Sequence, residues 1–285
     1  MRETVIITGA TSFIGIAMIK RLLRENVDVV AVVRPNTSRK KMLRTLYPNI
    51  MIIECELSEL DTIVLPQKRY SSVYHIGWNS DFENSRYNIL GQLKNVEYSK
   101  KAVQMAINYH CSSVLCIGSQ AECGVINVPI SSKTEDNPMN AYAEAKCIAF
   151  DKTSALCRDF GIDLFWPRLL SAYGPYDRKS TLIMSCLQAC KERRVIELTA
   201  AEQIWDYVYI DKVAEALNLI VKCGKPLKKY AIGSGNGRVL RDYISDISEI
   251  MRFPELLDGI GKKEYAINQV MYLVADVSEL EKDIN

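Results

Sequence analysis

Residues 8–15 read TGATSFIG, and they follow the apolar run VIIT at 5–8 without a break. Gly9 permits a tight turn after the strand, and Gly15 lets the next helix pack closely against it, so that the amides between them can face a pyrophosphate. A strict G-x-x-G-x-x-G pattern has a third glycine where this chain has Ser12, a small residue and a good helix N-cap. The alternative interpretation is a tight strand–helix turn and nothing more. Because the motif follows the first strand and opens a helix, we predict a dinucleotide site formed by Gly9, Thr11, Ser12, Phe13, Ile14 and Gly15.

The chain continues from this turn as an alternation of short β-branched runs and helical patterns. Runs typical of strands occupy 5–8, 27–33, 50–53, 72–76, 113–117 and 163–167, and the clearest helical patterns occupy 16–25, 88–109 and 141–160. Continuous apolar strands separated by helices are typical of a parallel sheet that is covered on both faces. We therefore predict an α/β fold of the doubly wound Rossmann kind.

The end of the second strand bears on the choice of dinucleotide. An NAD site usually has an acidic residue there to bind the ribose diol, whereas this chain reads VVRPNTSRKK at 32–41, with Arg34 and no carboxylate nearby. Ser38 resembles the N-cap of the next helix, which would put Arg39, Lys40 and Lys41 in its first turn, where the helix dipole disfavours cations unless an anion lies among them. A 2′-phosphate would be that anion, so NADPH/NADP is favoured over NAD. A solvated basic turn is the alternative.

After Pro167 the alternation loosens and the loops lengthen. We predict that 1–167 form an NADP(H)-binding Rossmann domain and that 168–285 form a smaller C-terminal substrate-binding lobe, with some later segments returning to the sheet. The chain shows neither an internal repeat nor a low-complexity linker.

Composition excludes several classes of protein. The 285 residues are 48% hydrophobic and 25% charged with a net charge of +2, which is ordinary for a globular protein and gives no reason to expect nucleic acid. No leader pattern opens the chain and no apolar stretch approaches the roughly 20 residues of a membrane span, so we expect a cytoplasmic protein that does not bind membranes. The nine cysteines include no Cys-x-x-Cys pair, and we expect scattered reduced thiols and no metal.

Residues 139–146, MNAYAEAK, place Tyr142 and Lys146 four residues apart. On a helix this spacing puts both side chains on one face, where they can touch. Taken alone, the pair is equally compatible with an amphipathic surface turn that carries an exposed aromatic residue.

Together, TGATSFIG, YAEAK at 142–146 and WDYVYIDKVAEAL at 205–217 resemble the extended short-chain dehydrogenase/reductases over nearly the whole chain. YHIGWN (74–79), QLKNV (92–96), GSQAECG (118–124) and EQIWDYVYI (202–210) are most similar to bacterial reductases of nucleotide-linked 4-keto-6-deoxysugars, a group also named the epimerase/dehydratase family. The resemblance implies a homodimer that pairs the helices around 88–109 and 141–160.

The resemblance also implies roles for individual residues. Ser119 would hydrogen-bond the substrate carbonyl, Tyr142 would be the general acid, and Lys146 would lower the pKa of the phenol and bind the nicotinamide ribose. The cofactor site would then comprise Gly9, Thr11, Ser12, Phe13, Ile14, Gly15, Arg34, Ser38, Arg39, Tyr142, Lys146 and Pro167, and the substrate site Trp78, Asn79, Ser119, Gln120, Ser171 and Trp205.

Two comparisons with the family narrow the expected reaction. Its dehydratases have an Asp-Glu pair directly after the catalytic serine or threonine, where this chain has Gln120 and Ala121. Its epimerases retain NAD and carry the acidic residue that the second strand lacks here. We therefore expect an NADPH-dependent reductase of a nucleotide-linked 4-keto-6-deoxysugar. The alternatives are a sugar-nucleotide 4-epimerase that retains NAD, a reductase of an unrelated carbonyl compound, and a non-catalytic nucleotide-sensing or scaffold protein.

The chain also departs from the family where the substrate would bind. Ser171 stands in place of an asparagine, Trp205 in place of an arginine that binds the diphosphate, and Ala266 close to the place of a second arginine. Other cations must then bind the two phosphates of a nucleotide sugar. The candidates are Arg178, Lys179, Arg193 and Arg194.

Overall fold

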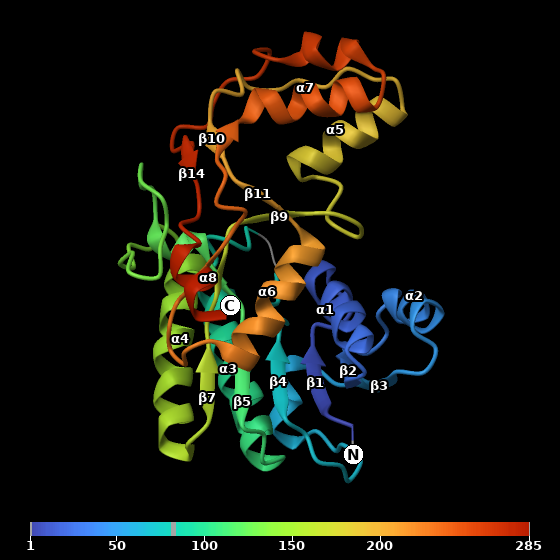
Figure 1. Cartoon of the computed structure of the whole chain (residues 1–285), viewed down its shortest axis with the longest axis vertical. Coiled ribbons are helices and arrows are strands. Elements are labelled where there is room, and N and C mark those ends of the chain that lie inside the picture. Colours follow the sequence, from blue (N-terminus) through green and yellow to red (C-terminus); the bar gives the residue numbers. More distant parts are fainter. Residues whose placement is uncertain (1, 81–83, 285) are drawn as a thin grey trace.

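A six-stranded parallel sheet forms the centre of the protein in the computed structural model, which describes residues 2–80 and 84–284 (Figure 1). The strand order is β3-β2-β1-β4-β5-β7, which reverses between β1 and β4. The strands are β1 (Thr4–Thr8), β2 (Asp28–Val33), β3 (Met51–Glu54), β4 (Ser72–His75), β5 (Ser113–Cys116) and β7 (Asp163–Phe165). This order confirms the doubly wound Rossmann fold that the sequence predicts.

Helices cover both faces of the sheet, which is why the interiors of its strands are largely apolar. One face packs against α1 (Phe13–Arg24), α6 (Ile210–Cys223) and α8 (Ser278–Ile284). The other packs against η1 (Leu57–Thr62), α3 (Ile89–Asn108) and α4 (Ala141–Phe160). The short helix α2 (Arg39–Leu46) lies at the β3 edge (Figure 1).

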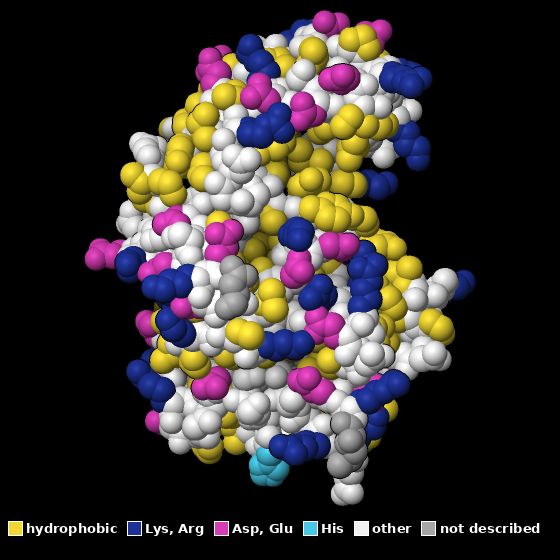
Figure 2. All heavy atoms as spheres, viewed as in Figure 1, with side chains coloured by type: hydrophobic (Ala, Val, Ile, Leu, Met, Phe, Trp, Pro, Cys, Tyr) yellow, Lys and Arg dark blue, Asp and Glu magenta, His cyan; other side chains and the backbone are white. Residues whose placement is uncertain are grey.

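A smaller lobe stands above the carboxyl ends of the strands and has its own apolar core (Figure 1). It contains α5 (Leu182–Lys191), α7 (Leu240–Ile250), η3 (Pro254–Gly259) and a three-stranded sheet of β13 (Arg238–Val239), β10 (Ile204–Trp205) and β14 (Tyr272–Leu273). Figure 2 shows the surface hollowed on one side between this lobe and the body below it.

The chain crosses between the body and the lobe more than once. Two small sheets connect them, and their strands are β6 (Gly118–Ser119), β8 (Arg168–Leu169) and β12 (Ala231–Ile232) in one, and β9 (Ser171–Tyr173) and β11 (Tyr207–Tyr209) in the other. After β11 the chain returns to the body as α6 and finally as α8, whose apolar residues belong to the main core. Such returning segments were expected from the sequence. The proposed boundary between the two domains at residue 167 stays a prediction.

Three further observations concern membrane, metal and thiol chemistry. None of the helices that the structure describes combines the length and the apolar character needed to cross a bilayer. Among the described residues, no three His, Cys, Asp or Glu side chains gather as a metal site would require. All nine cysteines are free thiols, and seven of them are buried.

Candidate active site

The glycine turn after β1 has the close backbone approaches that the sequence indicates. Gly9 has a φ of +64°, and a Cβ atom there would lie 2.7 Å from the amide nitrogen of Gly77. A Cβ atom on Gly15 would lie 2.4 Å from the carbonyl oxygen of Gly9. Ser12 caps α1, because its Oγ accepts a hydrogen bond of 3.0 Å from the Gly15 amide. The first amides of a helix have no intrahelical acceptors, so this turn suits the pyrophosphate of a dinucleotide.

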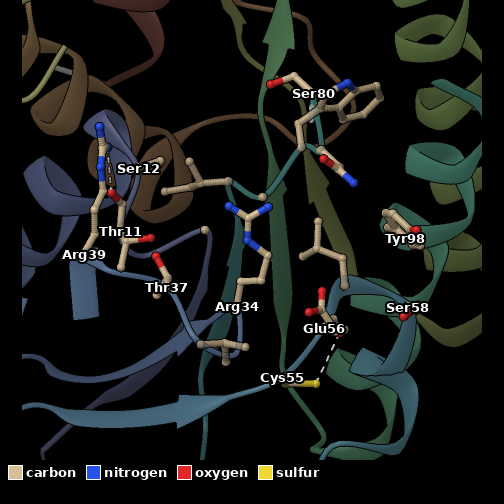
Figure 3. A pocket seen from close by; sticks show the side chains of 17 residues that line it. Thr11, Ser12, Arg34, Thr37, Arg39, Cys55, Glu56, Ser58, Ser80 and Tyr98 are labelled. Carbon is tan, nitrogen blue, oxygen red and sulfur yellow. Dashed lines mark hydrogen bonds between the residues drawn. The ribbon is translucent and has the colours of Figure 1, made fainter. Parts of the chain in front are cut away.

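A basic cavity of about 290 Å³ opens beside this turn (Figure 3). Arg34, directly after β2, projects its guanidinium into the middle of the cavity. Arg39, at the start of α2, lies against the glycine turn and donates a hydrogen bond of 3.2 Å to the carbonyl oxygen of Thr11. Five of the expected cofactor residues thus line one cavity, namely Gly9, Thr11, Ser12, Arg34 and Arg39. Phe13 and Ile14 line a second cavity, which also contains Tyr142 and Lys146.

The helix after β2 begins where the sequence predicts. Ser38 occupies the N-cap position of α2, which puts Arg39, Lys40 and Lys41 in the first turn, although its side chain makes no capping hydrogen bond. The segment also has carboxylates close by, since Glu54 at the end of β3 forms an ion pair with Lys40 and Glu56 lines the cavity. These acids are distant in sequence from the end of β2, and the pairing of β2 with β3 brings them there. Arg34 and Arg39 remain the cations that line the cavity.

Ser119, Tyr142 and Lys146 converge at the carboxyl ends of β4 and β5. Ser119 ends the short strand β6, while Tyr142 and Lys146 lie in the first two turns of α4. Asn140 caps that helix through a hydrogen bond of 3.0 Å from the Ala143 amide. Ser119 lies close enough to Tyr142 for its side chain to oppose the rise in the pKa of the phenol. The three residues that the resemblance assigns to catalysis thus meet in one place.

Lys146 is almost completely buried, with 4% of its surface exposed. Its ammonium donates a hydrogen bond of 2.6 Å to the carbonyl oxygen of Ile117 and lies 3.5 Å from the centre of the Trp78 ring, a cation–π contact. Burial lowers the pKa of Lys146 to about 8, and the Glu122 carboxylate opposes part of that effect.

The phenol of Tyr142 behaves differently from the expectation. Burial raises the pKa of Tyr142, while its hydrogen bond with Ser119 and the positive charge of Arg86 oppose that rise. Lys146 was expected to lower the pKa of Tyr142. In the chain alone, that pKa is nevertheless raised above its ordinary value. The physical reason is that removing water from the phenolate outweighs the nearby charges.

The other predicted site residues of the Rossmann domain lie near Ser119, Tyr142 and Lys146. Some of them form backbone hydrogen bonds. Trp78 packs edge to face on Tyr142 at 5.9 Å, and its indole nitrogen donates a 2.9 Å hydrogen bond to Gln92. The amide nitrogen of Asn79 donates to Asn95 at 2.7 Å. Gln120 begins the short helix η2 after Ser119. The carbonyl of Pro167 accepts from the Gly118 amide at 2.8 Å, which ties β7 to the strand that carries Ser119.

A buried ionic network behind Ser119 has no counterpart in the sequence reasoning. The carboxylate of Glu122 accepts hydrogen bonds from the Ser119 amide at 2.7 Å, from Trp166 at 3.1 Å and from Arg168 at 3.2 Å. Arg168 also pairs with Asp136. The sequence signal was Glu122 itself, a charged residue three positions after Ser119, but its partner Arg168 lies far along the chain.

The lobe residues form a separate group. Trp205 donates a 2.8 Å hydrogen bond from its indole nitrogen to the hydroxyl of Ser171, and it lines a cavity of about 240 Å³ with Lys263 and Tyr207. Of the four cation candidates, Arg193 donates a hydrogen bond to the carbonyl of Arg252, and Arg194 pairs with Glu192 and lines a further cavity of the lobe.

The other two candidates differ from each other. Lys179 lines the same cavity of the lobe as Arg194, whereas Arg178 lines the cavity that contains Tyr142 and Lys146, together with Arg86, which the sequence reasoning missed.

This fold and this site define a dinucleotide-dependent enzyme of the short-chain dehydrogenase kind. A sequence profile of the NAD dependent epimerase/dehydratase family matches residues 5–233. The chain belongs to that family, which confirms the resemblance and, at the level of the family, the expectation of an NAD(P)-dependent oxidoreductase.

The individual relatives carry names of nucleotide-sugar enzymes. CDP-abequose synthase of Salmonella typhimurium is 24% identical, with 99% of this chain and 92% of that protein covered. The trifunctional UDP-glucose 4,6-dehydratase/UDP-4-keto-6-deoxy-D-glucose 3,5-epimerase/UDP-4-keto-L-rhamnose-reductase of Arabidopsis thaliana is 23% identical over 87% of this chain, which spans 39% of the length of that protein.

Solved structures at lower identity show the same fold. UDP-glucose 4-epimerase of Thermotoga maritima with UDP-glucose superposes with a TM-score of 0.86 at 19% identity, covering 98% of this chain and 91% of that one. A dTDP-glucose 4,6-dehydratase of Streptomyces venezuelae with NAD bound gives 0.83 at 17% identity, covering 99% of this chain and 90% of that one.

Proposed function

We propose that the protein is an NADPH-dependent reductase of a nucleotide-linked 4-keto-6-deoxysugar. The observation that carries the proposal is the convergence of Ser119, Tyr142 and Lys146 beside a dinucleotide cavity that contains Arg34 and Arg39. The names of the relatives support a nucleotide-linked sugar as the substrate. The curated protein that combines three activities includes a UDP-4-keto-L-rhamnose-reductase activity.

In such a reaction, residues of this chain would position the substrate carbonyl and donate the proton to its oxygen. Ser119 would donate a hydrogen bond to the carbonyl oxygen, and Tyr142 would deliver the proton as the alcohol forms. Lys146, already beside Tyr142 on α4, would provide the positive charge that favours loss of that proton. The dinucleotide, when bound, would supply the hydride.

The choice of NADPH depends on the two arginines of the dinucleotide cavity. Arg34 projects into the cavity and Arg39 lies at the glycine turn. A guanidinium suits a phosphate because it can donate two parallel hydrogen bonds to it. Glu56 also lines this cavity. Its carboxylate would accept a hydrogen bond from a hydroxyl or amino group of the cofactor, and the 2′-phosphate would lie at the two arginines instead.

Elimination of water is poorly supported by the residues after Ser119. Gln120 and Ala121 have no carboxylate. Glu122 follows them, but it is fully buried and accepts hydrogen bonds from Ser119, Trp166 and Arg168. A carboxylate that is fully buried and engaged in this way supports the fold of the segment and is not accessible to a substrate.

A fluorescence screen of NADPH oxidation against a panel of 4-keto-6-deoxy nucleotide sugars tests the proposal. We expect oxidation with at least one nucleotide sugar and no reaction in the absence of the sugar. No oxidation across UDP-, CDP- and dTDP-linked ketosugars would contradict it.

The second candidate is a sugar-nucleotide 4-epimerase, which the same three catalytic residues would serve. An epimerase retains its NAD through turnover, whereas a reductase exchanges its cofactor. Extraction of the denatured protein separates the two, because tightly bound NAD favours the epimerase and an empty or NADPH-loaded site favours the reductase.

A further inference from the structure

The catalytic cavity holds more positive charge than the cofactor requires. The cavity has a volume of about 420 Å³, and its charged lining residues are Arg39, Arg86, Lys146, Asp177 and Arg178. Arg39 and Lys146 are already assigned to the cofactor. Arg86 and Arg178 are therefore two cations without a role in the proposed reaction.

Both guanidiniums are held near the reacting end of the cavity. Arg86 precedes α3, its carbonyl accepts a 3.0 Å hydrogen bond from the Tyr142 amide, and its guanidinium carbon lies 5.3 Å from the centre of the Tyr142 ring. Arg178, in the loop before α5, is 3.5 Å from the hydroxyl of Ser80. Their positive charges act on Tyr142 from these two segments, against the rise in its pKa that burial produces.

Among the described residues, no carboxylate forms an ion pair with Arg86 or Arg178, although fifteen others among the lysines and arginines form one. The nearby Asp177 accepts hydrogen bonds from the Arg178 amide at 2.7 Å and from Thr181 at 2.8 Å, so its carboxylate supports the loop.

We propose that Arg86 and Arg178 form a subsite that binds an oxyanion of the substrate beside the carbonyl group that Tyr142 protonates. The oxyanion is either a carboxylate on the sugar or the diphosphate that links the sugar to its nucleotide. Guanidinium groups suit both, since each presents two oxygens in one plane. The subsite would replace the arginines that are missing at Trp205 and near Ala266. This inference rests on the proposed function for the role of Tyr142.

Calorimetry with the cofactor site saturated by NADP⁺ tests the subsite without any need for turnover. The probes are UDP-glucose, UDP-glucuronic acid and inorganic pyrophosphate, and the variants are Arg86→Met and Arg178→Met. Arg158→Met is the matched control, because Arg158 is an exposed arginine on the same helix as Tyr142 but roughly 24 Å farther along it.

We expect each variant at the subsite to bind an anionic probe about 10- to 100-fold more weakly, as loss of a charge-assisted hydrogen bond predicts, and the control to be unchanged. A loss confined to UDP-glucuronic acid assigns the subsite to a sugar carboxylate. An equal loss for UDP-glucose, UDP-glucuronic acid and pyrophosphate assigns it to the diphosphate.

Three results would overturn the subsite. The first is unchanged affinity for every probe in both variants, and the second is a wild-type chain that binds none of the probes. The third is an equal loss of affinity for NADP⁺, which would assign the arginines to the cofactor. If pyrophosphate binds in an arginine-dependent manner and neither nucleotide sugar binds, the subsite stands and the proposed substrate class fails.

Discussion

At Tyr142 and Lys146 the fold sets two titratable groups side by side and keeps water from both. Burial raises the pKa of the phenol and lowers that of the ammonium to about 8. Both shifts favour the neutral forms, so the unliganded chain holds a protonated acid ready beside a lysine that is still largely charged at neutral pH. The catalytic consequences can be separated by substitution.

The three catalytic candidates should differ in what they damage. Tyr142→Phe should leave cofactor binding nearly intact and lower turnover by about 10² to 10⁴, the usual contribution of a positioned general acid. Lys146→Ala should weaken both cofactor binding and turnover, and Ser119→Ala should lower turnover to an intermediate degree. Calorimetry with NADPH and steady-state rates on a confirmed substrate measure the pattern. Full reductase activity in Tyr142→Phe would show that the motif has no catalytic role.

Lys146 should also make stability depend on pH. Its folded-state pKa of about 8 lies below the ordinary value of 10.5. The unfolded chain therefore binds more protons between these values, and the contribution of Lys146 to stability rises as pH increases from 8 to 10.5 and is lost as pH falls. The free energy of unfolding of the wild type, relative to Lys146→Met, should increase over that interval in urea titrations. A difference that does not change with pH would contradict the burial of the lysine.

At the scale of single elements, the start of α1 is set by a contact that leaves no room for a methyl group. Gly15→Ala would place its Cβ 2.4 Å from the Gly9 carbonyl, whereas Gly161→Ala, at the end of α4, would meet nothing within 4 Å. Gly161 has a φ of +65°, so its substitution costs only backbone strain.

We expect Gly15→Ala to lower the free energy of unfolding by roughly 1–3 kcal/mol, as overpacking does, and to abolish detectable binding of NADPH. Gly161→Ala should cost roughly 1–2 kcal/mol and leave binding intact. Thermal unfolding and calorimetry measure the two effects. Normal cofactor affinity in Gly15→Ala would place the dinucleotide elsewhere.

The connection from β2 to α2 offers a test of cofactor choice. Arg34 and Arg39 line the dinucleotide cavity, while Lys40 on the same segment pairs with Glu54. Replacing Arg34 and Arg39 by Met should remove the preference for NADPH over NADH, because each guanidinium supplies a charge-assisted contact worth roughly 1.5–3 kcal/mol. Lys40→Met should keep the preference. Equal affinity for the two cofactors in the unmodified protein would exclude the NADPH assignment.

At the scale of the whole molecule, the pair of helices α3 and α4 has an exposed apolar surface. Tyr87 is 74% exposed, Leu90 73% and Met139 58%, and all three lie at or just before the starts of these helices. Exposed apolar residues that lie near the starts of two neighbouring helices can contribute to a protein interface. They support the proposal of a homodimer built from α3 and α4 of two copies.

The dimer proposal is tested by a charge on that surface. Leu90→Glu should shift the mass measured by light scattering from two chains to one, since a buried unpaired carboxylate in the interface is costly. Ile250→Glu is the control, because Ile250 is 77% exposed but lies on α7 in the lobe. A single-chain mass for the unmodified protein, or the same loss in both variants, would contradict the proposed interface.

The sequence by itself determined the fold and the centre of the site, because both depend on local signals. Periodicity of apolar residues identifies strands and helices, the glycine turn identifies the first β-α unit, and the four-residue step of Tyr142 and Lys146 follows from helix geometry. Each of these signals lies within about twenty residues of chain, and the observed sheet order agrees with them.

Only the tertiary structure decided which charges meet. Lys40 pairs with Glu54 across the β2–β3 pairing, Glu122 receives Arg168 from beyond β7, and the loop residues Arg86 and Arg178 enter the cavity of Tyr142. The position of the N-cap at Ser38 was predicted from the sequence, but the absence of a capping hydrogen bond from its side chain was not. The periodicity of apolar residues shows which face of a helix or strand is buried. The partner of a charged residue depends on the tertiary fold, which brings together residues that are distant in the sequence.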